Sequence, residues 1–172
     1  MNTDHQQGDG VAGPGDAIPP QLFHAALPNW KAWAALHVRD EAGRILLLHS
    51  ATGWGWQHPG GHADQGELPH ETAEREVLEE TGHKLSPGPP LALVISPPRN
   101  GVPARFGVVF DGGVLTQDQA EQIRIDPGEH DEFHFATVDD WAHLLPPDAH
   151  VRLQAYEAAR CSGTTAYLTD LG

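Results

Sequence analysis

The sequence is poor in cysteine, and it has no long apolar segment. Cys161 is the single cysteine among 172 residues, and no zinc-like spacing surrounds it. An intrachain disulfide is therefore impossible. No apolar run reaches the length that spans a bilayer, and the first residues lack the charged-then-apolar pattern of a secretory signal. We expect a soluble, cytoplasmic protein with no membrane partner.

Positive charge is also scarce. The formal net charge is −14, and the lysines are limited to Lys31 and Lys84. Nucleic-acid-binding surfaces take most of their affinity from lysines and arginines that neutralise phosphates, so a nucleic-acid polymer is not the expected partner. A small phosphorylated substrate is compatible with this charge, provided that a cation bridges it to the protein and a few arginines assist.

The length suits one domain, because a chain of this size buries roughly 70% of the surface that its unfolded form exposes. Residues 1–20 are rich in Gly, Asp, Gln and Pro and poor in large apolar side chains. Such a composition predicts a disordered leader. We expect a single domain over residues 21–162 and a tail over residues 163–172.

The apolar pattern predicts an α/β fold. Residues 33–38 and 44–49 are apolar segments around a polar stretch that ends in Gly43, which predicts a β-hairpin. The run 45–48 is apolar on both faces, as a strand covered on both sides requires. Other expected elements are a short helix within residues 21–30, strands at residues 91–95, 105–110 and from 133, a turn at residues 111–113, and helices from residues 138 and 148.

Residues 67–80 are unusually rich in carboxylates: Glu67, Glu71, Glu74, Glu76, Glu79 and Glu80. Pro69 suits a first helical turn and Gly82 a C′ position, which predicts a helix over residues 69–81. Glu76, Glu79 and Glu80 then lie on one side of that helix. Each like-charge pair costs roughly 0.2–0.5 kcal/mol. A hard divalent cation would offset this cost, and Mg²⁺, with Mn²⁺ as a substitute, suits oxygen ligands.

The preceding loop is compatible with the same site. Pro59, Gly60 and Gly61 form a turn sequence that lets the backbone approach a metal or phosphate closely. A loop carbonyl could join the carboxylates as a ligand. The competing interpretation is a glutamate-rich helix that is only a solvated face.

The spacing of these residues resembles the box of the Nudix (MutT-like) hydrolase family, G-x5-E-x7-R-E-U-x-E-E-x-G-U, where U is a bulky apolar residue. The matching residues are Gly61, Glu67, Arg75, Glu76, Val77, Glu79, Glu80 and Gly82, whereas His83 occupies the last apolar position. The upstream Trp56 and the Pro-Gly-Gly turn are also similar to the family. The resemblance implies a Nudix-type α/β/α sandwich, with a mixed sheet between helices and the box as a loop-helix-loop.

For activity, the resemblance implies Mg²⁺-dependent hydrolysis of a diphosphate linkage in a nucleoside diphosphate joined to another group, through attack of an activated water on phosphorus. It implies Glu79, Glu80 and the Gly60 carbonyl as metal ligands, and Glu76 as a further ligand or as the base. It implies that Arg75 holds a box carboxylate. We expect Gly61, Glu67 and Gly82 to shape the box.

Two other functions have the same fold. A non-catalytic nucleotide-binding module is the main alternative, although such modules commonly lose box glutamates and this chain keeps them. An isomerase is disfavoured, because its reaction is expected to need a cysteine near the centre of the fold, whereas Cys161 lies near the end of the chain.

Residues 126–132 form a second acidic stretch before an expected strand. In the family, a carboxylate from this region completes the metal site or acts as the base. Glu132 is the predicted residue and Glu129 the second choice. The choice of base between Glu76 and Glu132 stays open, as does a merely solvated loop.

Candidate substrate contacts lie outside the carboxylate cluster. Arg99 and Arg105 could bind phosphate through their guanidinium groups, although a surface charge or an internal ion pair is the favoured interpretation. His58 and His62 flank the Gly-Gly turn, so either could touch the substrate. Trp56 could stack on a base or pack in the fold. The sequence leaves open the particular nucleotide substrate, the number of metal ions and the formation of a homodimer.

Overall fold

The computed structural model of the chain describes residues 19–27 and 29–169. The predicted leader therefore lies outside the described residues, apart from its last two prolines. The elements are α1 (Pro20–Ala26), β1 (Lys31–Asp40), β2 (Ile45–Ser50), β3 (Gly55–Gln57), β4 (Gly60–His62), α2 (Pro69–Thr81), β5 (Pro90–Ser96), β6 (Arg105–Leu115), α3 (Gln117–Glu121), β7 (His130–Ala136), α4 (Val138–Trp141), α5 (Pro147–Ser162) and β8 (Ala166–Thr169). No helix among them has the length and apolarity needed to cross a membrane.

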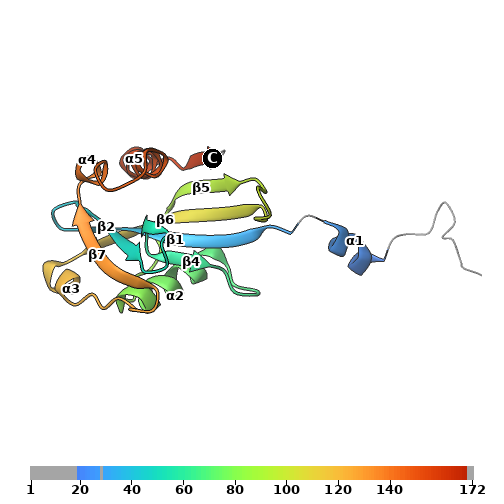
Figure 1. The fold of residues 1–172 in the computed structure, drawn as a ribbon, viewed down its shortest axis with the longest axis horizontal. Coiled ribbons are helices and arrows are strands. Elements are labelled where there is room, and N and C mark those ends of the chain that lie inside the picture. The colour runs from blue at the N-terminus through green and yellow to red at the C-terminus, as the bar shows by residue number, and fades with distance from the viewer. Residues whose placement is uncertain (1–18, 28, 170–172) are drawn as a thin grey trace, which may run out of the picture.

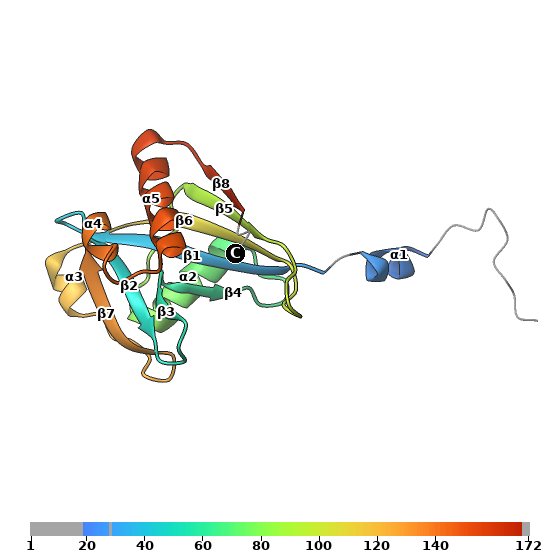
Figure 2. The same ribbon diagram turned by 45° about the horizontal axis from the view of Figure 1, so that its top comes forward.

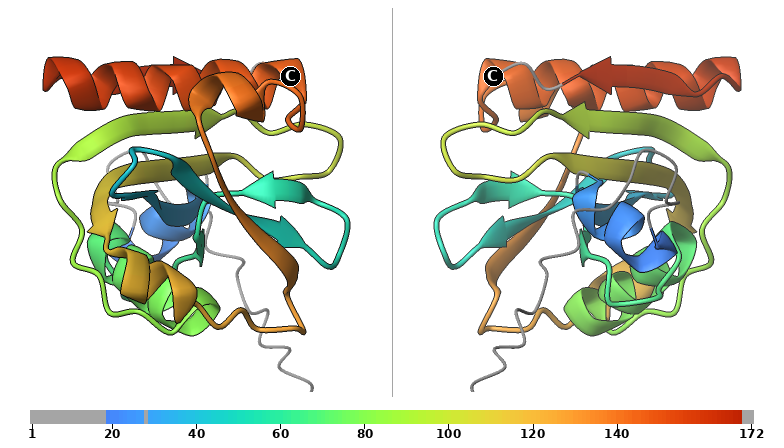
Figure 3. Two further views of the ribbon diagram at one scale, coloured as in Figure 1. Left: turned by 90° about the vertical axis from the view of Figure 1, so that its left-hand side faces the viewer. Right: turned by 90° about the vertical axis from the view of Figure 1, so that its right-hand side faces the viewer.

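A mixed sheet forms the centre of the described chain. Its strands follow the order β3-β2-β1-β6-β5-β8, with β4 paired to β1 and β7 paired to β2. The pairs β1/β6 and β5/β8 are parallel, and the other pairs are antiparallel. Helices α4 and α5 cover one face, and α2 and α3 cover the other (Figures 1 and 3). This is the predicted α/β/α sandwich.

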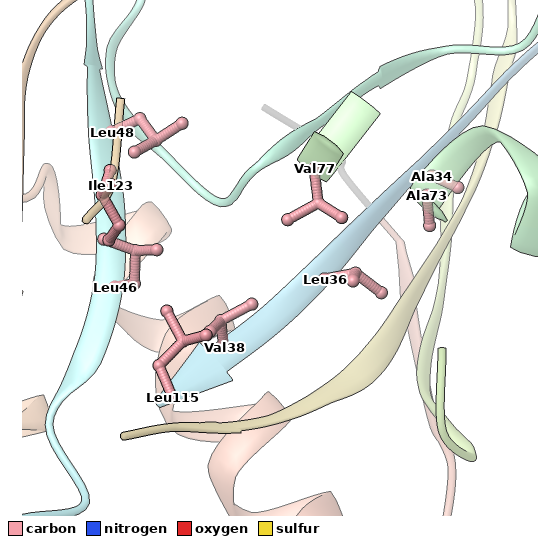
Figure 4. Packing of buried hydrophobic residues seen from close by; sticks show 9 residues of the cluster. All are labelled: Ala34, Leu36, Val38, Leu46, Leu48, Ala73, Val77, Leu115 and Ile123. Atoms are coloured by element: carbon pink, nitrogen blue, oxygen red, sulfur yellow. The ribbon is translucent and has the colours of Figure 1, made fainter. Parts of the chain in front are cut away.

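The strand β2 is buried on both faces, as its uninterrupted apolar run predicts. Leu46 and Leu48 pack in the cluster beneath α2, whereas Ile45 and Leu47 pack on the opposite side with Trp141. The α2 side is the larger cluster. Figure 4 shows its members: Ala34, Leu36, Val38, Leu46, Leu48, Ala73, Val77, Leu115 and Ile123.

The helix α2 begins and ends where the sequence predicts. Pro69 is its first residue, and the N–H of Leu68 donates to the Glu71 side chain at 2.9 Å. Gly82 follows its last residue with φ of 76°, a left-handed conformation that favours glycine. Ala73 and Val77 face the sheet, so the box carboxylates lie at the edge of a packed stripe.

The predicted turn at residues 111–113 is wrong. These residues lie inside β6, which runs to Leu115. His37 of β1 pairs with Asp111, and Arg39 pairs with Val114, so the register shifts at this point. Two consecutive glycines are typical of a chain reversal. Here the Gly-Gly pair instead lies at an irregularity within a long strand.

The domain continues beyond the predicted end at residue 162. After α5 the chain turns at Gly163, and β8 adds a parallel edge strand next to β5 (Figure 2). Ala166 and Leu168 pack beside the cluster that contains Tyr156. A four-residue strand with two inward side chains gives too short a pattern to be predicted from sequence.

Candidate active site

The strand β4 is confined between β1 and the helix α2. A Cβ added at Gly60, where φ is 154°, would lie 2.3 Å from the carbonyl oxygen of Ala34. A Cβ added at Gly61 would lie 2.4 Å from Oε1 of Glu76. Both distances are too short for a side chain. The two glycines therefore allow the loop backbone to lie directly against a carboxylate of α2.

The side chain of Arg75 connects the loop with three carboxylates of the box. Its Nε lies 2.8 Å from Oε1 of Glu67, and its Nη1 lies 2.9 Å from Glu76 and 3.0 Å from Glu79. Its Nη2 donates to the carbonyl oxygen of His62 at 3.1 Å. The Arg75 hydrogen bond lowers the pKa of Glu67 to about 2. Arg75 thus contacts three box carboxylates, which is the kind of contact that the family resemblance implies.

Glu80 is a buried carboxyl group. Its Oε2 accepts the backbone N–H of Gly60 at 2.7 Å, and its Oε1 lies 2.7 Å from Nε2 of His130. Burial raises the pKa of Glu80 to about 7, although the hydrogen bonds from His130 and Gly60 oppose this rise. A nearby positive charge would stabilise the ionised form of a carboxyl group in this environment.

Glu129 joins the box carboxylates from the loop before β7. Glu80, Glu129 and His130 each offer one ligand atom, and these atoms lie within 4.8 Å of one another. Burial raises the pKa of Glu76, and the nearby charges of Glu79 and Glu129 add to this rise. Carboxylate side chains from two separate parts of the chain therefore lie close together.

Glu132 does not point into this group. It lies within β7 opposite His49, it is exposed, and it does not line the cavity described below. The pairing shifts between His49 and Ser50, which leaves Asp131 as an extra residue. The structure therefore places Glu129, and not the predicted Glu132, beside the box carboxylates, because the strand begins earlier than the sequence pattern indicates.

The donor set fits a divalent cation. Glu80 and Glu129 each offer a carboxylate oxygen, and His130 offers an imidazole nitrogen. Of the two carboxylates, that of Glu80 is buried. Glu76 adds a half-buried carboxylate close by. Glu79, with a side chain that is 59% exposed, lies at the outer edge of the group and is held by Arg75. Gly60 contacts the group through its N–H.

A cavity of about 640 Å³ opens beside these residues. Four of the five candidate substrate contacts line it: Trp56, His58, His62 and Arg105. Arg99 does not line it, and lies in an exposed loop where it pairs with Val102. The cavity is also lined by Gly60, Gly61, Glu80, Glu129 and His130. The candidate metal ligands and the candidate substrate contacts thus share one space.

Aromatic residues from distant parts of the chain form much of the cavity wall. Trp33 of β1 and Tyr156 of α5 line it, as does Arg152. The ring of Trp56 lies 5.1 Å from that of Trp141, so its position is fixed by packing. Trp56 therefore packs beside the core cluster that contains Trp141 and also forms part of the cavity wall.

Sequence reasoning missed several polar residues at this site. His130 follows the acidic loop directly, and this adjacency was an available signal. His37, fully buried on β1, lies 3.0 Å from His58 and 3.1 Å from Glu157. Glu157 belongs to α5, a helix with no recognisable motif. Its contact with His37 joins residues 120 positions apart, which no local pattern reveals.

Comparison with known proteins identifies the family. The NUDIX domain model matches residues 28–158, which is most of the chain and includes the box and the acidic loop. The chain belongs to the Nudix family.

Individual relatives agree with this assignment. A Streptomyces rubellomurinus protein named CMP-5'-(N-acetyl-N-hydroxy-3-aminopropyl)phosphonate hydrolase is 40% identical over 102 residues, covering 53% of this chain and 48% of the relative. This chain thus spans about half the length of that curated relative. The MutT protein of Methanosarcina mazei Go1 is 26% identical with a TM-score of 0.63, over 79% of this chain and 96% of that one. A UDP-X diphosphatase shares the fold with a TM-score of 0.64 at 18% identity, over 89% and 76%.

Proposed function

We propose that this Nudix family member hydrolyses a diphosphate linkage in a nucleoside diphosphate joined to another group, with Mg²⁺ as cofactor and Mn²⁺ as a substitute. The observation that carries the proposal is the buried carboxyl group of Glu80, which meets Glu129 and His130 on the wall of a cavity large enough for a nucleotide. The site combines cation ligands, an arginine and aromatic rings.

Glu80, Glu129 and His130 would hold the cation, with Glu76 and Glu79 adjacent. When bound, the cation would neutralise the carboxylates and polarise the phosphorus-bound oxygens. The N–H of Gly60 fixes one oxygen of Glu80. Arg75 fixes Glu76 and Glu79 through Nη1. These contacts position the carboxylates before a ligand arrives, which reduces the reorganisation that the reaction requires.

Phosphate binding and proton transfer are assigned to separate side chains. Arg105 lines the cavity, and its guanidinium can offer paired N–H donors to phosphate oxygens. Glu76 is the proposed base, because burial raises its pKa and so makes its carboxylate a better proton acceptor for an attacking water. Glu129 is the alternative base, in place of Glu132, which the sequence pattern predicts for this role.

The name of the curated relative supports the substrate class. That protein is named as a hydrolase of a CMP-phosphonate, in which a nucleotide is joined to a second phosphorus acid. A cavity with Trp33, Trp56 and Tyr156 in its wall offers rings against which a base can stack. A nucleotide-type small molecule is therefore the proposed partner.

The proposal is tested by release of phosphate-containing products from nucleoside triphosphates, nucleotide sugars and dinucleoside polyphosphates, with Mg²⁺ or with EDTA. We expect turnover of one class that EDTA abolishes and added Mg²⁺ restores. Tight binding without turnover of any member would instead favour the non-catalytic nucleotide-binding module.

A further inference from the structure

A single glycine interrupts the first half of the strand β6. Gly107 is buried and lies among apolar residues of that strand. An isolated glycine inside a strand often marks a place where another group approaches the backbone closely. A Cβ added at Gly107 would lie 1.9 Å from Cε2 of Trp33 and 2.2 Å from Cζ2 of the same ring. Gly107 therefore leaves the space that the indole of Trp33 occupies.

The register of the sheet explains this contact. Trp33 of β1 is the partner of Gly107 in the parallel pair β1/β6, and Val94 of β5 is the partner of Gly107 on the other side. Trp33 packs against the cluster that contains Val94 and Tyr156 of α5. The indole of Trp33 therefore lies across β6, on the face of the sheet that α5 covers (Figure 3).

The indole is fixed before any ligand binds. Trp33 is half-buried, with the backbone of Gly107 beneath its ring and the side chains of the cluster beside it. Trp33 also lines the cavity. A flat aromatic surface that is already held in place loses little side-chain entropy when a ligand covers it.

The other large aromatic rings of the cavity wall are less suited to hold a ligand. Trp54 is 78% exposed, so it would have to be ordered on binding. The ring of Trp56 lies 5.1 Å from the ring of Trp141 and 5.1 Å from that of His49. Tyr156 is only 5% exposed. The first ring lacks a support, and the other two are engaged in packing.

Trp33 also lies at a suitable distance from the candidate metal ligands. Two positions further along β1, Ala35 pairs with Gly60, whose N–H donates to Glu80. Trp33 and Ala35 both line the cavity, as alternate residues of one strand face do. Two strand positions span roughly 7 Å. This is the scale of the ribose that separates a nucleobase from its phosphate.

We propose that Trp33 is a binding residue whose indole stacks on the nucleobase of the substrate. Gly107 is a positioning residue, because a side chain at this position would displace the indole. Every nucleobase has a π face, so this contact favours nucleotides over sugar phosphates without selecting one base. The inference rests on the proposed nucleotide-type substrate but not on its hydrolysis.

The inference is tested by calorimetric binding of AMP, GMP, CMP and UMP to the full chain with Mg²⁺, each compared with ribose 5-phosphate, which lacks the base. Trp33→Leu should weaken binding of the tightest nucleotide about tenfold, a typical loss when one stacked ring is removed. The affinity for ribose 5-phosphate should stay within about twofold. Trp33→Phe keeps an aromatic face and should retain most of the nucleotide affinity.

Trp30→Leu is the matched control. Trp30 is 45% exposed and does not line the cavity. The same substitution there should leave the affinities for the nucleotide and for ribose 5-phosphate as in the wild type.

Tryptophan fluorescence separates direct stacking from a packing effect. The bound nucleotide should quench the emission of the wild type and of Trp30→Leu. In Trp33→Phe most of this quenching should be absent at saturating nucleotide, although calorimetry still detects binding. If Trp33 only supports the cavity wall, the quenching in Trp33→Phe will equal that in the wild type.

A double variant tests the role of Gly107. Gly107→Ala should weaken nucleotide binding about tenfold when Trp33 is present, because the new Cβ displaces the indole. In the Trp33→Leu background the same change should alter the affinity by less than about twofold, since the indole is no longer there. Additive losses would contradict the positioning role of Gly107.

The binding of none of the four nucleotides would overturn the inference. So would an equal loss of affinity for the nucleotide and for ribose 5-phosphate in Trp33→Leu, or undiminished quenching in Trp33→Phe. Binding that depends on Trp33 without turnover of any substrate would refute the proposed hydrolysis and leave the role of Trp33 intact. Turnover with a kcat/KM that Trp33→Leu does not change would support the hydrolysis and refute the stacking.

Discussion

Nε2 of His130 lies 2.7 Å from Oε1 of Glu80, and both side chains are buried. The two residues are 50 positions apart in the chain. Their contact joins the last glutamate of the Nudix box to the acidic loop before β7. It places an imidazole and a carboxyl group of raised pKa at the point where we propose that a cation binds.

The first prediction concerns the pH dependence of metal affinity. The pKa of Glu80 is raised to about 7, so its carboxyl group is protonated below that pH and ionised above it. Protons therefore compete with Mg²⁺ at low pH, and the apparent affinity should rise from about pH 6 to about pH 8. Calorimetry in buffers of different ionisation enthalpy should also detect proton release. An affinity that is constant over this range would contradict the assignment of Glu80 as a ligand.

The second prediction compares two glutamates that are close in the sequence, one in the loop before β7 and one within β7. Glu129 lies with the candidate metal ligands, whereas Glu132 is exposed and outside the cavity. Glu129→Gln should reduce kcat by about 100-fold, a typical loss when a metal ligand or general base is removed. Glu132→Gln should stay within about twofold of the wild type, as expected for a surface substitution. If steady-state kinetics show a larger loss of kcat for Glu132→Gln than for Glu129→Gln, the result would support the sequence-based prediction of Glu132.

The third prediction tests the close approach of β4 to α2. In Gly61→Ala the new Cβ would lie 2.4 Å from Oε1 of Glu76, so the carboxylate or the strand must move. Overpacking of this kind costs about 1–3 kcal/mol, and displacement of Glu76 should also lower kcat. Both effects can be measured by urea unfolding and by steady-state kinetics.

Gly128→Ala is the matched control for that substitution. Its added Cβ would lie 3.2 Å from the side chain of Asp126, a flexible neighbour, and the backbone at Gly128 has no positive φ. Equal effects of the two alanine substitutions would show that the contact between Gly61 and Glu76 is unimportant.

The elements that could be predicted from sequence are those with local determinants. Pro69 and Gly82 set the limits of α2, and the two-sided apolar run of β2 indicates its burial on both faces. The orienting role of Arg75 is implied by the resemblance to the Nudix box, and its partners Glu67, Glu76 and Glu79 are close to it in the sequence. In each case the relevant partners lie within a short stretch of chain.

The features that could not be predicted depend on register or on long-range packing. An extra residue at Asp131 decides that Glu129, rather than Glu132, accompanies Glu80. Likewise His37 and Glu157 meet only because α5 packs across the sheet from a distant part of the sequence. The periodicity of apolar residues describes one helix or strand at a time. It therefore contains no information on the register of β7 or on the contact between His37 and Glu157.

The most direct test of the proposed metal-dependent hydrolysis is the Mg²⁺ dependence of turnover in Glu80→Gln, measured with the nucleotide class that the wild type hydrolyses. The substitution removes one charge and keeps the shape. We predict a loss of at least about 100-fold in kcat/KM at moderate Mg²⁺, with the fold retained by circular dichroism and with Glu121→Gln unaffected. Full activity of Glu80→Gln with an unchanged Mg²⁺ requirement would contradict the proposed site.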